Sequence, residues 1–227
     1  MQLFYFLIVF LIIIWSFQPS ASGKKSATLP GLGNWFQSLL PSSKDKITTA
    51  VALTNQEVIY RHFKYLATHL EKYKITYWVT YGTLLGGIRE KNIIAKDHNF
   101  DVGCFLKDAS KIEALNREIK KDGYLLAKGK NGKLWRNSFK LLYRSNELEK
   151  YQAWGDIFLY HLCPDNYFRR YNLDSGLYLW PRSTFHSSFL QPLDQVFIQD
   201  RSYPAPNRGK FLLEYWYGPN WQVPVQP

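Results

Sequence analysis

The chain is predicted to fold as an α/β domain in which a mixed sheet is flanked by helices. Short runs of β-branched and aromatic residues alternate with longer segments whose apolar side chains recur at helical spacing. The composition agrees, because 46% hydrophobic residues in a chain of 227 supply one sizeable core and exclude an intrinsically disordered protein.

Three parts are expected along the chain: a leader (1–22), a linker or stem (23–46) and the folded domain (47–227). The apolar run at residues 3–17 is short for a membrane-spanning helix, which needs about 20 residues. Ser20 and Ser22 fit a cleavage site, so a signal peptide is favoured over an uncleaved type II membrane anchor. Residues 23–46 are rich in Ser, Lys, Gly and Pro, as linkers are.

Both interpretations of the leader place the domain in the lumen of the secretory pathway (ER or Golgi) or outside the cell. Membrane association through the apolar segment is the alternative to free secretion. The formal charge of +11 can attract phosphorylated donors, acidic glycans or an anionic membrane surface, and a generally solvated basic surface is the alternative. No base-reading motif is recognisable, so nucleic acid is not an expected partner.

Cys104 and Cys163 could form a disulfide or remain two buried thiols.

The first half of the domain supplies the candidate site. Residues 54–73 are predicted to form a helix and residues 75–79 a strand, followed by a turn at Gly82-Thr83. Residues 84–89 then begin a helix whose first N–H groups have no internal partners and attract anions. This turn is therefore a candidate phosphate site, although such turns are common.

The next segment, residues 97–102, alternates as a strand does. Asp97, Asn99 and Asp101 would then share one face, where their oxygens suit a hard divalent cation. A phosphate site beside a metal site is the arrangement that phosphoryl transfer requires. A solvated strand edge is the alternative interpretation.

The second half of the domain is predicted to complete the sheet. Asp108 would cap a helix whose buried face is Ile112, Leu115 and Ile119, and residues 124–127 and 138–144 would form a β-hairpin. Asp156 enters the apolar run 157–160, which indicates a central strand. Burying a lone charge is costly, so Asp156 is a further candidate site residue.

The C-terminal segment is rich in aromatic residues and prolines. From Tyr167 onward, the proline density predicts extended segments that wrap the core in place of regular sheet. Asn207 is predicted to cap a last helix that runs through Trp216 and stops at Gly218-Pro219.

Four motifs together resemble the LicD/fukutin family: residues 81–89, 93–103, 154–158 and 217–221. The resemblance covers roughly residues 56–222 in the right order. It implies a nucleotidyltransferase-like fold and the transfer of phosphocholine or a polyol phosphate from a CDP-activated donor to a glycan or glycoprotein acceptor. The implied cofactor is Mg²⁺ or Mn²⁺.

The resemblance also implies roles for individual residues. Gly82 and Thr83 would hold a phosphate, and Arg89 would be a donor-phosphate or packing residue. The carboxylates of Asp97, Asp101 and Asp156 would be catalytic and would hold the metal, with Asn99 as a fourth ligand.

Asn99 departs from the family pattern, which usually has an acidic residue there. An amide brings no charge to a metal site. Two hypotheses therefore follow: an active metal-dependent transferase, or a catalytically weakened member that serves as a luminal binding module for a nucleotide, a phosphoglycan or a partner transferase. The transferred group and the acceptor are not determined by the sequence.

Overall fold

The structure, a computed structural model, describes residues 54–128, 139–144, 152–171, 173 and 178–224. The predicted leader and stem lie outside the described residues. Among the helices of the described ranges, none is both long and apolar enough to span a lipid bilayer.

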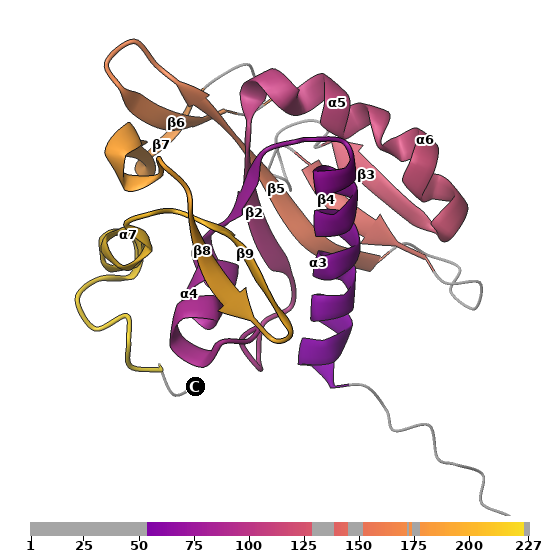
Figure 1. The fold of residues 1–227 in the computed structure, drawn as a ribbon, viewed down its shortest axis with the longest axis horizontal. Helices are drawn as coiled ribbons and strands as arrows, with labels where there is room; N and C mark the ends of the chain where they lie inside the picture. Colours follow the sequence, from indigo (N-terminus) through magenta and orange to yellow (C-terminus); the bar gives the residue numbers. More distant parts are fainter. Residues whose placement is uncertain (1–53, 129–138, 145–151, 172, 174–177, 225–227) are drawn as a thin grey trace, which may run out of the picture. The chain divides into compact units, whose positions relative to one another are not determined.

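A mixed seven-stranded sheet forms the centre of the domain (Figure 1). Its order is β1-β2-β5-β4-β3, and β6 pairs with both β5 and β7. β2 and β5 are parallel, whereas the other described pairs are antiparallel. The strands of this sheet are β1 (Tyr77–Val79), β2 (Phe100–Phe105), β3 (Tyr124–Lys128), β4 (Phe139–Tyr143), β5 (Gln152–Leu162), β6 (Tyr167–Tyr171) and β7 (Tyr178–His186).

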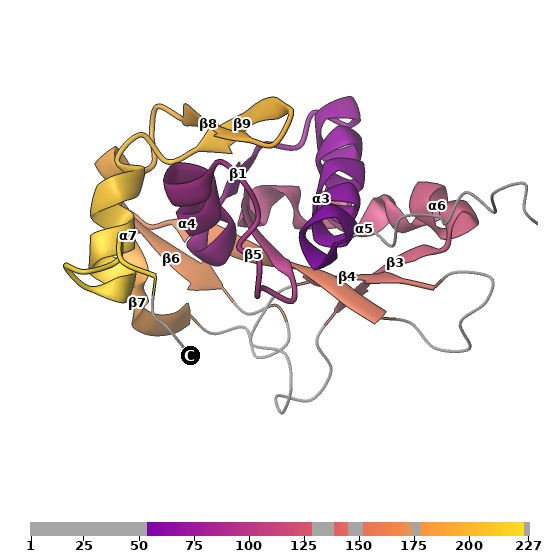
Figure 2. The same cartoon turned by 90° about the horizontal axis from the view of Figure 1, so that it is seen from below.

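Helices flank this sheet, and α3 and α4 lie on the same side of it (Figure 2). α3 begins with a capping box in which Thr54 and Glu57 satisfy each other's backbone N–H groups. The helices are α3 (Asn55–Lys72), α4 (Tyr81–Glu90), α5 (Ala109–Ala114), α6 (Asn116–Ile119) and α7 (Gly209–Tyr217), with short 3₁₀ turns η1 (Leu106–Asp108), η2 (Lys120–Asp122) and η3 (Ser187–Phe189).

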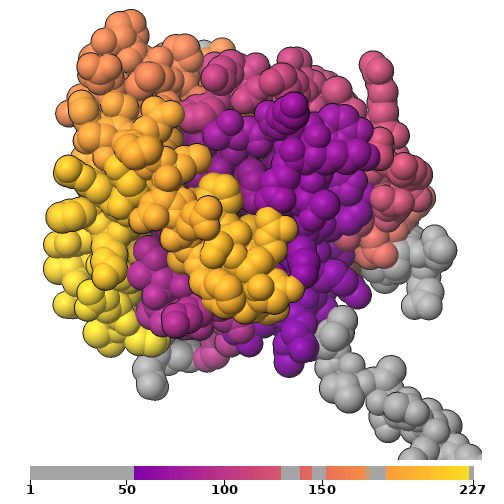
Figure 3. Space-filling view, viewed as in Figure 1, coloured from indigo at the N-terminus to yellow at the C-terminus, as the bar shows by residue number. Residues whose placement is uncertain are grey.

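A separate hairpin, β8 (Asp194–Ile198) with β9 (Arg201–Ala205), covers α4 (Figures 2 and 3). Gly87 of α4 lies against the side chains of Val196 and Ile198, where a Cβ would approach them to 3.0 and 3.1 Å. The hairpin therefore closes the outer side of α4 and buries it between two layers.

Aromatic rings pack directly on glycines at the centre of the sheet. Trp78 of β1 lies opposite Gly103 of β2, and Phe100 of β2 lies opposite Gly155 of β5. A Cβ would come within 2.3 Å of the Trp78 ring and 2.1 Å of the Phe100 ring. Because no larger residue fits at either position, these contacts fix the relative placement of β1, β2 and β5.

Two predictions for the segment before β2 are wrong in detail. The predicted turn at Gly82-Thr83 is already helical, because the sharp change of direction is made at Tyr81, whose φ is 42°. The predicted strand at 97–102 begins only at Phe100. Residues 97–99 form a bend in which the Asp97 N–H donates to the Ile94 carbonyl at 3.0 Å, and such local bonds compete with strand pairing.

Other predicted elements are confirmed. β3 and β4 form the predicted hairpin, and β5 is the predicted central strand, paired with β2, β4 and β6. The predicted buried face of Ile112, Leu115 and Ile119 is also present.

The prediction of an irregular C-terminal segment is wrong, since it forms β6, β7 and the β8–β9 hairpin. Its prolines are compatible with strands where an N–H is not needed. Pro204, for example, lies on β9, which pairs on one side only, with β8.

Of the two predicted caps, one is right in position and the other is wrong. Asp108 is the N-cap residue of α5, but its side chain makes no capping bond, and its Oδ1 accepts from Lys111 Nζ at 2.8 Å. Asn207 precedes the N-cap residue Arg208, and its Nδ2 donates to the Gln191 carbonyl at 3.1 Å.

Of the two open alternatives for the cysteines, the structure has two buried free thiols, Cys104 and Cys163.

His62 is a neutral side chain on the buried face of α3. Its Nδ1 lies 2.8 Å from the Tyr124 hydroxyl, and its ring stacks on Trp154 with centroids 4.6 Å apart. Burial, together with the nearby charge of Arg61, lowers the pKa of His62 to about 4.

We expect acid to destabilise the domain through His62. The unfolded chain takes up this proton near pH 6.5 and the folded protein only near 4, so stability is lost as the pH falls through that interval, by up to about 3 kcal/mol. Urea unfolding at pH 7.5 and 4.5 measures the loss. His62→Phe should lose less stability than wild type between these values, and an equal loss would contradict the assignment.

Candidate active site

Two carboxylates meet because of strand register. β2 and β5 are parallel, and Asp101 lies directly opposite Asp156. Asn99 lies beside both: its Nδ2 is 3.3 Å from Asp101 Oδ1 and 3.0 Å from Asp156 Oδ2. Side chains from the bend and from two strands therefore form one polar cluster at the start of β2.

The N-terminus of α4 holds Asp101 in place. The Gly82 N–H donates to Asp101 Oδ2 at 3.1 Å, and Thr83 Oγ1 accepts from the Asp101 N–H at 2.7 Å. Thr83 is only 2% exposed. The two residues predicted to bind phosphate are thus engaged with Asp101 in the structure, and their phosphate contacts stay a prediction.

Asp97 reaches the same point from the bend. A Cβ placed on Gly82 would lie 2.8 Å from Asp97 Oδ2 and 3.2 Å from Asp101 Oδ2. Two carboxylate oxygens therefore converge above Gly82, in space that only a glycine leaves open. Oxygen donors of this kind suit a hard divalent cation, so the residues present fit the expected Mg²⁺ or Mn²⁺.

The charges of the cluster repel one another. Burial, followed by the negative charges of Asp156 and Asp97, raises the pKa of Asp101 well above its usual value. Burial also raises the pKa of Asp97, although backbone N–H groups of His98 and Asn99 donate to it. The surroundings of Asp101 and Asp97 therefore oppose ionisation of both carboxyl groups.

Lys140 supplies a positive charge that the sequence interpretation missed. It lies on β4 directly opposite Asp156, and its Nζ forms an ion pair with Asp156 Oδ1. The two side chains are 19% and 10% exposed. The signal available in the sequence was a lysine within the otherwise largely apolar strand Phe139–Tyr143.

This pairing affects the predicted metal set of Asp97, Asn99, Asp101 and Asp156. Throughout the part of the chain that the structure describes, three or more His, Cys, Asp and Glu side chains do not come together in a preformed metal-binding group. The four residues are neighbours, but Asp156 is held by Lys140 and Asn99.

Arg89 lies apart from the cluster. It occupies the C-terminal end of α4, about 10 Å along the helix from Gly82 at 1.5 Å per residue. Its Nε donates to Glu90 Oε1 at 3.0 Å. The structure therefore brings Gly82, Thr83 and the predicted carboxylates together, and leaves Arg89 at the opposite end of the helix.

The end of α7 borders the cluster. Trp216 packs on Tyr81 with ring centroids 4.5 Å apart, next to Gly82. Tyr217 follows and is 47% exposed. Partial burial and the charges of Asp101 and Asp97 raise the pKa of the Tyr217 hydroxyl, which places it within the field of the carboxylates.

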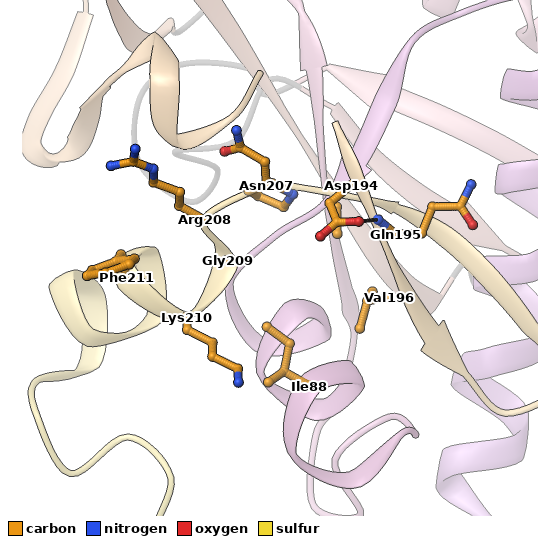
Figure 4. A pocket seen from close by; sticks show the side chains of 11 residues that line it. Ile88, Asp194, Gln195, Val196, Asn207, Arg208, Gly209, Lys210 and Phe211 are labelled. Atoms are coloured by element: carbon orange, nitrogen blue, oxygen red, sulfur yellow. Dashed lines mark hydrogen bonds between the residues drawn. The ribbon is translucent and has the colours of Figure 1, made fainter. Parts of the chain in front are cut away.

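A cavity of about 310 Å³ lies near the other end of α4, between β8 and the start of α7 (Figure 4). Ile88 of α4 and Val196 of β8 line it, together with Lys210 of α7. None of the predicted site residues lines this cavity, so it is separate from the carboxylate cluster.

The chain is similar in sequence to known proteins of one family. The family model described as "LicD/FKTN/FKRP, nucleotidyltransferase domain" matches residues 74–208, which is more than half of the chain. The chain is also 27% identical over 161 residues to the human protein named ribitol 5-phosphate transferase FKRP, and 26% identical over 163 residues to the mouse protein of that name. Each match covers 69% of this chain and 30% of the relative, so the chain spans about a third of the length of these relatives.

Loss of the Thr83 hydroxyl should destabilise the site. Thr83→Val keeps the shape of the side chain but leaves the buried Asp101 N–H without its acceptor, which costs about 1–3 kcal/mol. Thr83→Ser is the matched control, because it retains the hydroxyl. Urea unfolding compares the two variants, and equal stability of the valine and serine variants would contradict the role assigned to this bond.

Proposed function

Because the chain belongs to the LicD/FKTN/FKRP nucleotidyltransferase family, we propose that it is a metal-dependent transferase that moves a polyol phosphate or phosphocholine from a CDP-activated donor to a glycan or glycoprotein. The observation that carries this proposal is the convergence of Asp97 and Asp101 above Gly82, with Asp156 beside them. The relatives named as ribitol 5-phosphate transferases make ribitol phosphate the first transferred group to test.

The reaction exchanges one P–O bond for another. A glycan hydroxyl attacks the phosphorus that carries the polyol or choline, the bond to CMP breaks, and the hydroxyl proton leaves to solvent. Such chemistry depends mostly on positioning and on neutralising charge. Asp101 suits this task because the backbone of α4 and the Thr83 hydroxyl fix its position before any ligand binds.

Asp97 and Asp101 would hold the divalent cation, since their oxygens converge on the same space. When bound, Mg²⁺ or Mn²⁺ would neutralise the donor pyrophosphate and stabilise the charge that develops on its oxygens. It would also favour the charged form of Asp101, whose pKa is raised by burial and then by the charges of Asp156 and Asp97. Beside these two carboxylates, the charge of Lys140 balances the charge of Asp156.

The remaining features fit a luminal enzyme with an anionic donor. A formal charge of +11 attracts phosphorylated molecules, and the apolar leader would direct the domain into the secretory pathway. The exposed ring of Tyr217 at the edge of the cluster offers a surface for a donor or acceptor.

A luminal binding module is the second candidate, and Asn99 is the observation that favours it. Its amide nitrogen faces the carboxylates of Asp101 and Asp156, where an acidic residue would add charge for a metal. A binding module would retain its nucleotide or phosphoglycan ligand in chelator.

Replacing Asp101 should abolish turnover. Asp101→Ala removes a carboxylate proposed to hold the metal, so CMP release from CDP-ribitol should fall by about 100-fold or more, while the circular dichroism spectrum stays native. Asp165→Ala is the matched control, because Asp165 pairs with Arg169 at the β5–β6 turn away from the cluster. Full activity of the Asp101 variant would show that this assignment is wrong.

Ligand-dependent melting separates the two candidate functions. The full chain is heated with CDP, CDP-choline or CDP-ribitol, each with Mg²⁺, Mn²⁺ or EDTA, because a ligand that binds only the folded state raises Tm. A transferase should show a shift only with metal, whereas a shift that persists in EDTA supports the binding module. No shift with any of these ligands would contradict the transferase, and would leave a binding module whose ligand is a phosphoglycan or a partner protein.

A further inference from the structure

Asp156 is paired with the positively charged side chain of Lys140. Lys140 lies opposite it in the register of β4 and β5 and pairs with Oδ1, and Asn99 donates to Oδ2 at 3.0 Å. Both oxygens are therefore engaged by groups of the protein. The Lys140–Asp156 pair is largely shielded from water, which strengthens the attraction.

The charges of the cluster balance around a single divalent ion. Asp97, Asp101 and Asp156 bring three negative charges, and Lys140 removes one of them. The uncharged Asn99 adds none. The two charges that remain equal those of one Mg²⁺ or Mn²⁺, and buried charge is stable only when it is matched.

We propose that Lys140 takes the place of a second metal ion, so that the site binds one divalent cation on Asp97 and Asp101 while Asp156 stays outside the coordination sphere. Lys140 is thus a positioning residue that acts through Asp156. The presence of a metal in this site rests on the proposed function. The inference adds that one ion binds, and that Lys140 limits the number of ions to one.

Removing the lysine charge should tighten metal binding. In Lys140→Met, Asp156 is released from its partner and becomes a third carboxylate ligand, and affinity rises with ligand charge, so Mn²⁺ should bind about tenfold more tightly. Electron paramagnetic resonance of free Mn²⁺ during titration of the full chain, without donor, gives affinity and stoichiometry. The wild type should bind one ion.

Two further variants control for charge and for a structural role. Lys64→Met removes an ion pair with Asp200 on the outer side of α3 and should leave Mn²⁺ affinity within about twofold of wild type. The double variant Lys140→Met/Asp156→Asn removes the pair as a unit and keeps the net charge. Because Asp156 is not a ligand in the wild type, this variant should bind Mn²⁺ within about threefold of wild type.

Several results would overturn the proposal. They are unchanged or weaker Mn²⁺ binding in Lys140→Met, a loss of tenfold or more in the double variant, two ions in the wild type, or no binding by any variant. If Lys140→Met does not fold, Lys140→Gln makes the same removal with a polar side chain. The Mn²⁺ titration contains no donor, so its result does not depend on turnover. Missing turnover with both CDP-ribitol and CDP-choline would contradict the proposed function and leave the Mn²⁺ result intact.

Discussion

The parallel pairing of β2 with β5 is the contact on which the rest of the site depends. It places Asp101 beside Asp156, although the helical segment and the β3–β4 hairpin separate them in sequence. The register is set by the Phe100 ring, which occupies the space above Gly155 where a side chain would otherwise lie. A shift of one residue would turn one of the two carboxylates to the opposite face of the sheet, away from the other.

Bringing acidic groups together costs stability, and the fold offsets this cost locally. The backbone of α4 donates to Asp101, the Asn99 amide lies between two carboxylates, and Lys140 pairs with Asp156. Burial, followed by the charges of Asp156 and Asp97, still raises the pKa of Asp101. Keeping buried carboxylates together in this way costs stability, as functional sites often do.

The same elements serve both the core and the site. α4 is buried between the sheet and the β8–β9 hairpin, while its first turn holds Asp101 and leaves room for Asp97 at Gly82. α7 packs along α4 and brings Trp216 and Tyr217 to the edge of the cluster. The geometry of the carboxylates therefore rests on packed helices and strands, which define positions more sharply than loops do.

The sequence by itself determined the α/β class, the helix at 54–73, the β3–β4 hairpin and the central strand that Asp156 enters, because periodicity and a single charge in an apolar run are local signals. Only the tertiary structure decided what these residues contact. Lys140 joins the site through cross-strand register, Arg89 lies apart from it through the length of α4, and Asp97 reaches Gly82 from a bend. Such relations depend on which strands pair and how helices pack, and the spacing of residues along the chain does not encode them directly.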